Sequence, residues 1–239
     1  RGGSAMSIII KKEVSSFFST PFGYVFLGIF LLLSGMMFTI YNLLGGNGAL
    51  SGMFDLLKNV SFIIFPVLTM RMFAEERRNG TEQLLMTSRL RCVDIVLGKF
   101  LAAGVLFGCA LAATLVYVVI IAAHGSPNYG ALAASYLGFA LLGVSMIAVC
   151  TFISSFAENQ VTAAISAFGI LFLMVMLASF TRSLTIPVLS PILSALAITT
   201  RYDEFTRGVL RPGPVAYYLG VTAVCLVMAV KNLEYRRFR

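Results

Sequence analysis

The amino-acid sequence predicts an all-α integral membrane protein with six transmembrane helices, and three observations support this fold class. Hydrophobic residues make up 59% of the 239 residues and charged residues only 12%, whereas a soluble domain usually carries about 25% charged residues. The mean hydropathy is +0.91. The apolar residues also gather in runs long enough to cross a bilayer, so lipid is the expected solvent for most of the chain.

Four predicted spans contain no charged residue: 22–44, 100–123, 132–156 and 161–179. A helix needs about 20 apolar residues to cross a hydrocarbon core of ~30 Å, and each of these runs is about that long. The sixth span, 214–231, has a shorter apolar core. Tyr217 and Tyr218 stand near its start, where aromatic rings favour the membrane interface.

The second span is predicted over residues 54–74, because its uninterrupted apolar core, Val60–Met70, is too short alone. Asp55 and Lys58 then lie near one membrane surface, and the long lysine side chain is expected to snorkel toward water. Pro66 lies inside this span and is expected to kink its helix.

Positive charge is divided unequally between the two sides of the predicted bundle. Leaving out Arg1, twelve Lys and Arg lie on the side that holds both termini, and five lie on the opposite side. The twelve are Lys11, Lys12, Arg71, Arg77, Arg78, Arg89, Arg91, Lys99, Lys231, Arg236, Arg237 and Arg239; the five are Lys58, Arg182, Arg201, Arg207 and Arg211. By the positive-inside rule, both termini are expected in the cytoplasm.

The sequence is interpreted as one transmembrane domain, residues 6–239. Residues 1–5 precede Met6 and resemble an expression scar, and the start lacks the pattern of a cleavable signal peptide. The net charge of +8 is interpreted as topology-setting charge rather than as a nucleic-acid surface. The four cysteines have no partner at close spacing, so neither a disulfide nor a metal site is expected.

Two polar segments on the cytoplasmic side are candidates for function. Ser7–Ser19 mixes apolar and charged residues in the manner of an amphipathic helix on the membrane surface, either as a passive anchor or as a working part. The connection 75–99 turns at Asn79-Gly80. Before the turn, Arg71 and Glu75 are spaced to pair on one helix face.

After the turn, the connection 75–99 is expected to form a short helix. Thr81 suits an N-cap, and Glu82 suits the first turn, where it complements the helix dipole. Gln83, Leu84 and Leu85 continue the helix. Exposed apolar side chains bounded by charge indicate either a partner surface or burial against the membrane.

On the outer side, the connection 180–213 is rich in apolar residues but broken by three prolines, so it is expected to form short interfacial or re-entrant helices. Asp203 and Arg207 are spaced to pair within one of these helices. By contrast, Glu158–Gln160 is expected to form a tight hairpin between the fourth and fifth spans.

The chain is not expected to be an enzyme. It contains no G-x-x-x-x-G-K-[ST] motif for binding ATP phosphates. An intramembrane hydrolase would have to use Ser145 with His124, a weak candidate. Charged residues stand at span ends or in loops, which argues against coupling to protons or sodium ions. A self-contained secondary transporter and a structural membrane subunit remain alternatives.

Three segments together resemble a known family. The stretch PVLTMRMFAEERRNGTEQLLMTS (Pro66–Ser88) is followed by Val93–Leu101, the hairpin FISSFAENQVTAAISAF spans Phe152–Phe168, and YDEFTRG (Tyr202–Gly208) is followed by Pro214–Leu219. In this order they resemble the type 2 ABC (ABC-2) export permeases, in particular the gliding-motility, GldF-like type. The sequence departs from the family at Ser88-Arg89-Leu90, where a proline often follows the coupling helix.

The resemblance implies the ABC-2 (type V exporter) permease fold, with an amphipathic N-terminal elbow helix and short outer helices before the last span. It implies an exporter of an unidentified substrate. It also implies a second permease half, which would form a homodimer or a heterodimer with this chain. A separate ABC ATPase would hold ATP and magnesium, and this chain would bind no cofactor. The implied ATPase-coupling residues are Glu75, Glu76, Gly80, Thr81, Glu82, Gln83, Leu84 and Leu85.

Overall fold

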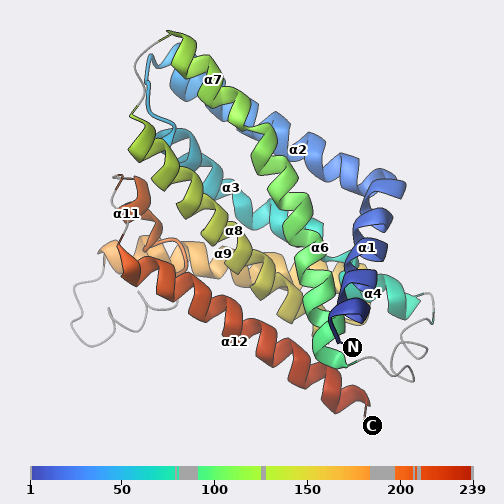
Figure 1. The fold of residues 1–239 in the computed structure, drawn as a ribbon. Coiled ribbons are helices and arrows are strands. Elements are labelled where there is room, and N and C mark those ends of the chain that lie inside the picture. Colours follow the sequence, from blue (N-terminus) through green and yellow to red (C-terminus); the bar gives the residue numbers. More distant parts are fainter. Residues whose placement is uncertain are drawn as a thin grey trace.

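The computed structural model is all-helical over the residues that it describes (Figure 1). These residues are 2–78, 80, 91–124, 128–183, 197–206, 208 and 211–237. Within them the helices are α1 (Gly2–Ser19), α2 (Pro21–Phe38), the π-helix η1 (Thr39–Leu44), α3 (Ser51–Thr69), α4 (Arg71–Arg78), α6 (Cys92–Ala113), α7 (Leu115–His124), α8 (Tyr129–Phe156), α9 (Gln160–Ser183), α11 (Tyr202–Thr206) and α12 (Pro212–Arg237).

The prediction of six transmembrane helices is confirmed. Six helical stretches in the described residues are long and apolar enough to cross a membrane: Pro21–Leu44, Ser51–Arg77, Cys92–Ala123, Tyr129–Phe156, Gln160–Ala178 and Pro212–Arg237. Several helices extend beyond the predicted apolar runs, because a helix can continue past the hydrocarbon into the interface. The largest difference is in the third span, whose helix α6 begins at Cys92 and not at residue 100.

The helix of the third span is also interrupted, which its uniformly apolar sequence does not predict. Thr114 separates α6 from α7, and its hydroxyl group donates to the carbonyl oxygen of Leu111 over 2.7 Å. The hydroxyl group of Tyr136 on α8 donates to the carbonyl oxygen of Thr114 over 2.8 Å. The backbone oxygen at the break is therefore satisfied by a neighbouring helix, as lipid requires.

Helix α8 forms the centre of the bundle and packs against α3, α6, α9, α11 and α12. In its most apolar stretch 72% of the residues are buried, whereas the value is 28% for the spans that contain α2, α6, α9 and α12. Small residues along α8 allow this close contact. Gly143 faces the rings of Phe107 and Phe65, and a Cβ atom at this position would lie 2.4 Å from Phe107.

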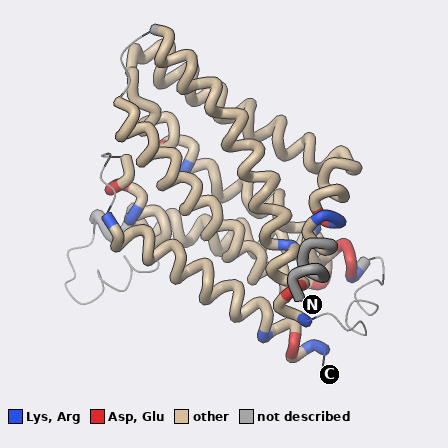
Figure 2. The backbone as a smooth tube through the Cα atoms, in the orientation of Figure 1, with Lys and Arg blue, Asp and Glu red and all other residues tan. Residues whose placement is uncertain are grey.

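Both termini lie at the same end of the bundle (Figure 1); we call this the terminal end and the opposite one the distal end. Helix α1 lies against α6 and α2 at the terminal end. Its residues Ile9 and Phe17 are buried while Lys11 and Lys12 are exposed, which confirms the predicted amphipathic helix. Charged residues gather toward the helix ends and most densely near the termini (Figure 2).

The predicted hairpin between the fourth and fifth spans is present at the terminal end. Helix α8 ends at Phe156, and α9 begins at Gln160. Asn159 caps α9, because its side-chain oxygen accepts a hydrogen bond from the backbone N–H of Thr162 over 2.8 Å. At the distal end, α11 is a short helix just before the last span, as predicted.

Replacing Gly143 with leucine is expected to destabilise the protein, because the new side chain would overlap the Phe107 and Phe65 rings. Overpacking of this kind costs about 1–3 kcal/mol. The measurement is the midpoint of thermal unfolding in detergent micelles, which should fall. Gly169→Leu is the matched control, since a Cβ atom at Gly169 meets no atom within 4 Å. Equal midpoints for the two variants would contradict this account of the core.

Candidate functional site

Helix α4 leads directly into the segment to which the sequence assigned coupling to an ATPase. Of the eight candidate residues, Glu75 and Glu76 lie on α4. Gly80 is exposed and has a φ of 67°, a left-handed conformation that favours glycine and suits the predicted turn. Thr81, Glu82, Gln83, Leu84 and Leu85 lie outside the described residues. The structure therefore describes three of the eight candidate residues, Glu75, Glu76 and Gly80.

A buried cation holds α4 to its neighbours. The Lys99 side chain on α6 is 2% exposed. Its Nζ atom lies 2.9 Å from Glu76 Oε1 on α4 and 3.3 Å from Glu13 Oε1 on α1, and it donates to the carbonyl oxygen of Met72 over 2.5 Å. Lys99 was expected at the end of the connection 75–99, whereas it lies within α6 and is buried.

This Lys99 cluster, defined as Glu13, Glu76 and Lys99, satisfies the hydrogen-bonding capacity of the lysine. The lysine ammonium group has three N–H donors, and three oxygen atoms from two other helices surround it. A buried charge needs such pairing, because taking it out of water costs several kcal/mol. The cluster therefore fixes α1, α4 and α6 relative to one another.

The predicted pair between Arg71 and Glu75 is confirmed. Arg71 Nη2 lies 2.8 Å from Glu75 Oε1 on the next turn of α4. The guanidinium group also lies 4.9 Å from the ring centroid of Phe22, near the start of α2. Arg71 thus adds a contact between α4 and the first span.

A second cluster joins α4 and α12 to the carboxyl end of α8. Arg77 donates to the carbonyl oxygens of Ser155, over 2.7 Å, and of Ala157. Asn232 on α12 donates to the same Ser155 oxygen over 3.0 Å, and Arg236 donates to Phe156 over 3.0 Å. The last carbonyls of a helix lack intrahelical partners and carry its negative dipole end, so these donors stabilise the α8 terminus.

At the distal end, Lys58 forms a comparable cluster. Its Nζ atom lies 2.6 Å from Asp55 Oδ1 and 3.4 Å from Asp203 Oδ1 on α11, and its side chain is only 6% exposed. The expectation that Lys58 snorkels toward water is therefore wrong. Asp203 binds Lys58, whereas its predicted partner, Arg207, lies outside the described residues. Burial raises the pKa of the adjacent Tyr202 hydroxyl, and the Asp55 carboxylate raises it further.

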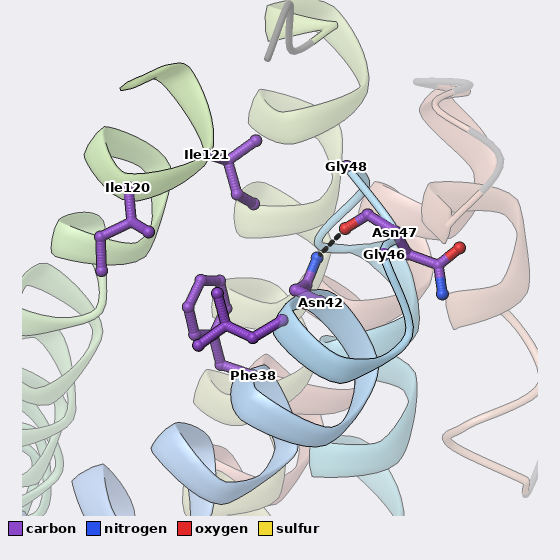
Figure 3. Close-up of a pocket in the computed structure, with 8 residues that line it drawn as sticks. Phe38, Asn42, Gly46, Asn47, Gly48, Ile120 and Ile121 are labelled. Atoms are coloured by element: carbon purple, nitrogen blue, oxygen red, sulfur yellow. Dashed lines mark hydrogen bonds between the residues drawn. The ribbon is translucent and has the colours of Figure 1, made fainter. Parts of the chain in front are cut away.

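The distal end also contains a mostly apolar cavity of about 300 Å³ between η1, the following loop and α7 (Figure 3). Asn42 closes the loop by donating to the carbonyl oxygens of Asn47, over 2.6 Å, and Ala49, over 3.0 Å. Gly46 adopts a φ of 65° in this loop. The cavity therefore has a defined polar wall.

The weak hydrolase candidate gains no geometric support. Ser145 is buried, and its hydroxyl group donates to carbonyl oxygens of its own helix, Leu141 at 3.0 Å and Leu142 at 2.9 Å. Such bonds are common for serine within a helix. The side chain of His124 lies outside the described residues.

Six apolar helices with charges concentrated toward their ends define a multi-pass integral membrane protein. The model of the ABC-2 family transporter proteins matches residues 46–230, which is 185 of 239 residues. The chain belongs to this family, whose members are membrane permeases of ABC transporters and not the ATPases themselves. None of the curated proteins compared with the chain matches it.

Family resemblance implied Glu75 and Glu76 as coupling residues, but no sequence pattern pointed to the residues that hold the terminal ends of the helices together. Lys99, Glu13, Arg77 and Asn232 come from four separate helices. The one available signal was Lys99 itself, a lone charge at the edge of an apolar run. Long-range pairs of this kind leave no local pattern.

Replacing Lys99 with methionine is expected to destabilise the protein by about 3–5 kcal/mol, because two partly buried carboxylates lose their shared cation. The measurement is denaturant unfolding in mixed micelles. The triple variant Glu13→Gln, Glu76→Gln, Lys99→Met should recover most of the loss. Lys231→Met, at an exposed site on α12, is the control and should change stability by less than about 0.5 kcal/mol. A Lys99→Met variant as stable as this control would refute the cluster's role.

Proposed function

We propose that the chain is the permease subunit of an ATP-driven exporter and that α4 receives the movement of a separate ABC ATPase. The ATPase would bind the segment from Gly80 to Leu85, with Leu84 and Leu85 as apolar anchors. ATP and magnesium would be held by that partner. This chain would supply the path for an unidentified substrate and bind no cofactor itself.

The attachment of α4 is the observation that carries this proposal. Glu76 joins α4 to α1 and α6 through Lys99, and Arg77 joins it to the end of α8. A displacement of the segment after Gly80 would therefore move several helices together. If α4 had only lipid contacts, the same displacement would move α4 without moving the other helices.

The proposed orientation places the terminal end in the cytoplasm. The excess of Lys and Arg on the side of both termini supports it, by the positive-inside rule. An ATPase that uses cellular ATP would meet α4 on this side. The distal end, with α11 and the Lys58 cluster, would then face away from the cytoplasm, and the membrane would be the bacterial cytoplasmic membrane.

The proposed complex contains a second permease half, either a copy of this chain or a related one. The outer segment Tyr202–Gly208 and the following Pro214–Leu219 support the GldF-like subtype through their resemblance to it. Exposed large apolar side chains on α2, α9 and α12 provide surface for both lipid and a partner permease.

Replacing both Leu84 and Leu85 with aspartate is expected to abolish co-purification of the ATPase, because charged side chains cannot fill apolar pockets on the partner. The measurement is the amount of ATPase retained on the affinity-tagged permease. Leu43→Asp with Leu44→Asp is the matched control, since this exposed leucine pair lies at the distal end and should leave ATPase binding intact.

Unchanged retention of the ATPase by the Leu84→Asp, Leu85→Asp variant would contradict the docking assignment. Substrate transport by the chain alone in liposomes, without any ATPase, would favour a self-contained secondary transporter. Stable ATPase binding with no nucleotide-dependent change in the spans would favour a structural subunit.

A further inference from the structure

An apolar groove runs along the outside of the bundle between α8, α9 and α12. Its volume is about 490 Å³. Val149 and Phe152 of α8 line it together with Met174 of α9, and α12 contributes residues from Ala216 to Cys225. At a rise of 1.5 Å per residue this side is about 14 Å long, which suits an extended hydrocarbon chain parallel to the helix.

The groove opens onto the apolar surface of the bundle. A Cβ atom at Gly220 would meet no atom within 4 Å, so the glycine widens the groove. Val224 on one side is 58% exposed, and Leu173 on α9 is 61% exposed. Hydrocarbon from the membrane can therefore enter sideways.

A cation stands at the distal end of the groove. Ile198 lines the groove, and Arg201 follows three residues later, just before α11. The Arg201 guanidinium carbon lies 5.4 Å from the ring centroid of Tyr217, which lines the groove as well. Among the described residues, no carboxylate lies within ion-pair distance of Arg201, since Asp203 binds Lys58 and Glu204 lies 4.0 Å from Arg211.

We propose that this groove binds a phospholipid, with one acyl chain between α8, α9 and α12 and the phosphate at Arg201. A guanidinium group binds phosphate oxygens through two parallel hydrogen bonds, and basic sites between transmembrane helices are suited to phospholipid headgroups. The Tyr217 ring holds the guanidinium group at the interface. The proposal is independent of the coupling role of α4.

The test is binding of phosphatidylglycerol to delipidated protein in detergent, followed by native mass spectrometry. Arg201→Gln is expected to lower the affinity for phosphatidylglycerol about tenfold, because one charge-assisted contact is lost. Gly220→Leu fills the groove and should lower the affinity by a similar factor. Diacylglycerol, which lacks the phosphate, should bind more weakly, and Arg201→Gln should leave its binding unchanged.

Two matched variants control for general effects. Arg211→Gln removes an exposed arginine at the start of α12, and Gly108→Leu adds a leucine at an open position on α6. Both should bind phosphatidylglycerol like the unaltered protein. Thermal unfolding checks that every variant is folded, and Arg201→Lys, which keeps the charge, should lose less affinity than Arg201→Gln.

Three outcomes would overturn the proposal. Unchanged phosphatidylglycerol binding in Arg201→Gln and Gly220→Leu would place the lipid elsewhere. Full competition by inorganic phosphate, with no effect of Gly220→Leu, would indicate an anion site without an acyl chain. A change in oligomeric state caused by Gly220→Leu, with lipid binding intact, would show that a second copy of the chain occupies the groove.

Discussion

The ammonium group of Lys99 lies in the protein interior, where it must have partners because an unpaired buried charge is strongly unfavourable. Its partners come from α1, which precedes the first span, and from α4, which forms the terminal end of the second span. Neither helix has a long apolar face to anchor it in lipid. The position of α1 therefore depends on this cluster and on the packing of Ile9 and Phe17, while α4 is also held by Arg71 and Arg77.

The backbone groups at the end of α8 also need partners. Its terminal carbonyl oxygens lie where water is partly excluded, and Arg77, Asn232 and Arg236 satisfy them. Since α8 is the central helix, these bonds connect the middle of the bundle to α4 and α12. The terminal end therefore contains a connected set of polar contacts next to the apolar bundle.

The sequence predicted the six spans because two general constraints leave few alternatives. A chain in lipid must satisfy its backbone within helices, and a helix must be about 20 residues long to cross. These constraints do not fix where a helix ends outside the hydrocarbon. For this reason the third span was predicted from residue 100, while α6 begins at Cys92.

The long-range partners of the two buried lysines were beyond local sequence reasoning. Glu13 and Lys99 are 86 positions apart, and Lys58 and Asp203 are 145 positions apart. Hydropathy places Lys58 near a membrane surface and Lys99 in the cytoplasmic connection 75–99, because it scores each residue without its partner. The Arg71–Glu75 and Asp55–Lys58 pairs have a local signal, since spacings of four and three place both residues on one helix face.

The most direct measurement is the nucleotide-dependent labelling of a distal cysteine, Gly48→Cys, in the complex with the co-purifying ATPase. The background should lack the four native cysteines. If the Lys99 cluster transmits movement, a trapped ATP state will change the labelling rate, and the Glu13→Gln, Glu76→Gln, Lys99→Met variant will abolish this change while keeping the ATPase bound. A change of equal size in that variant would contradict the account.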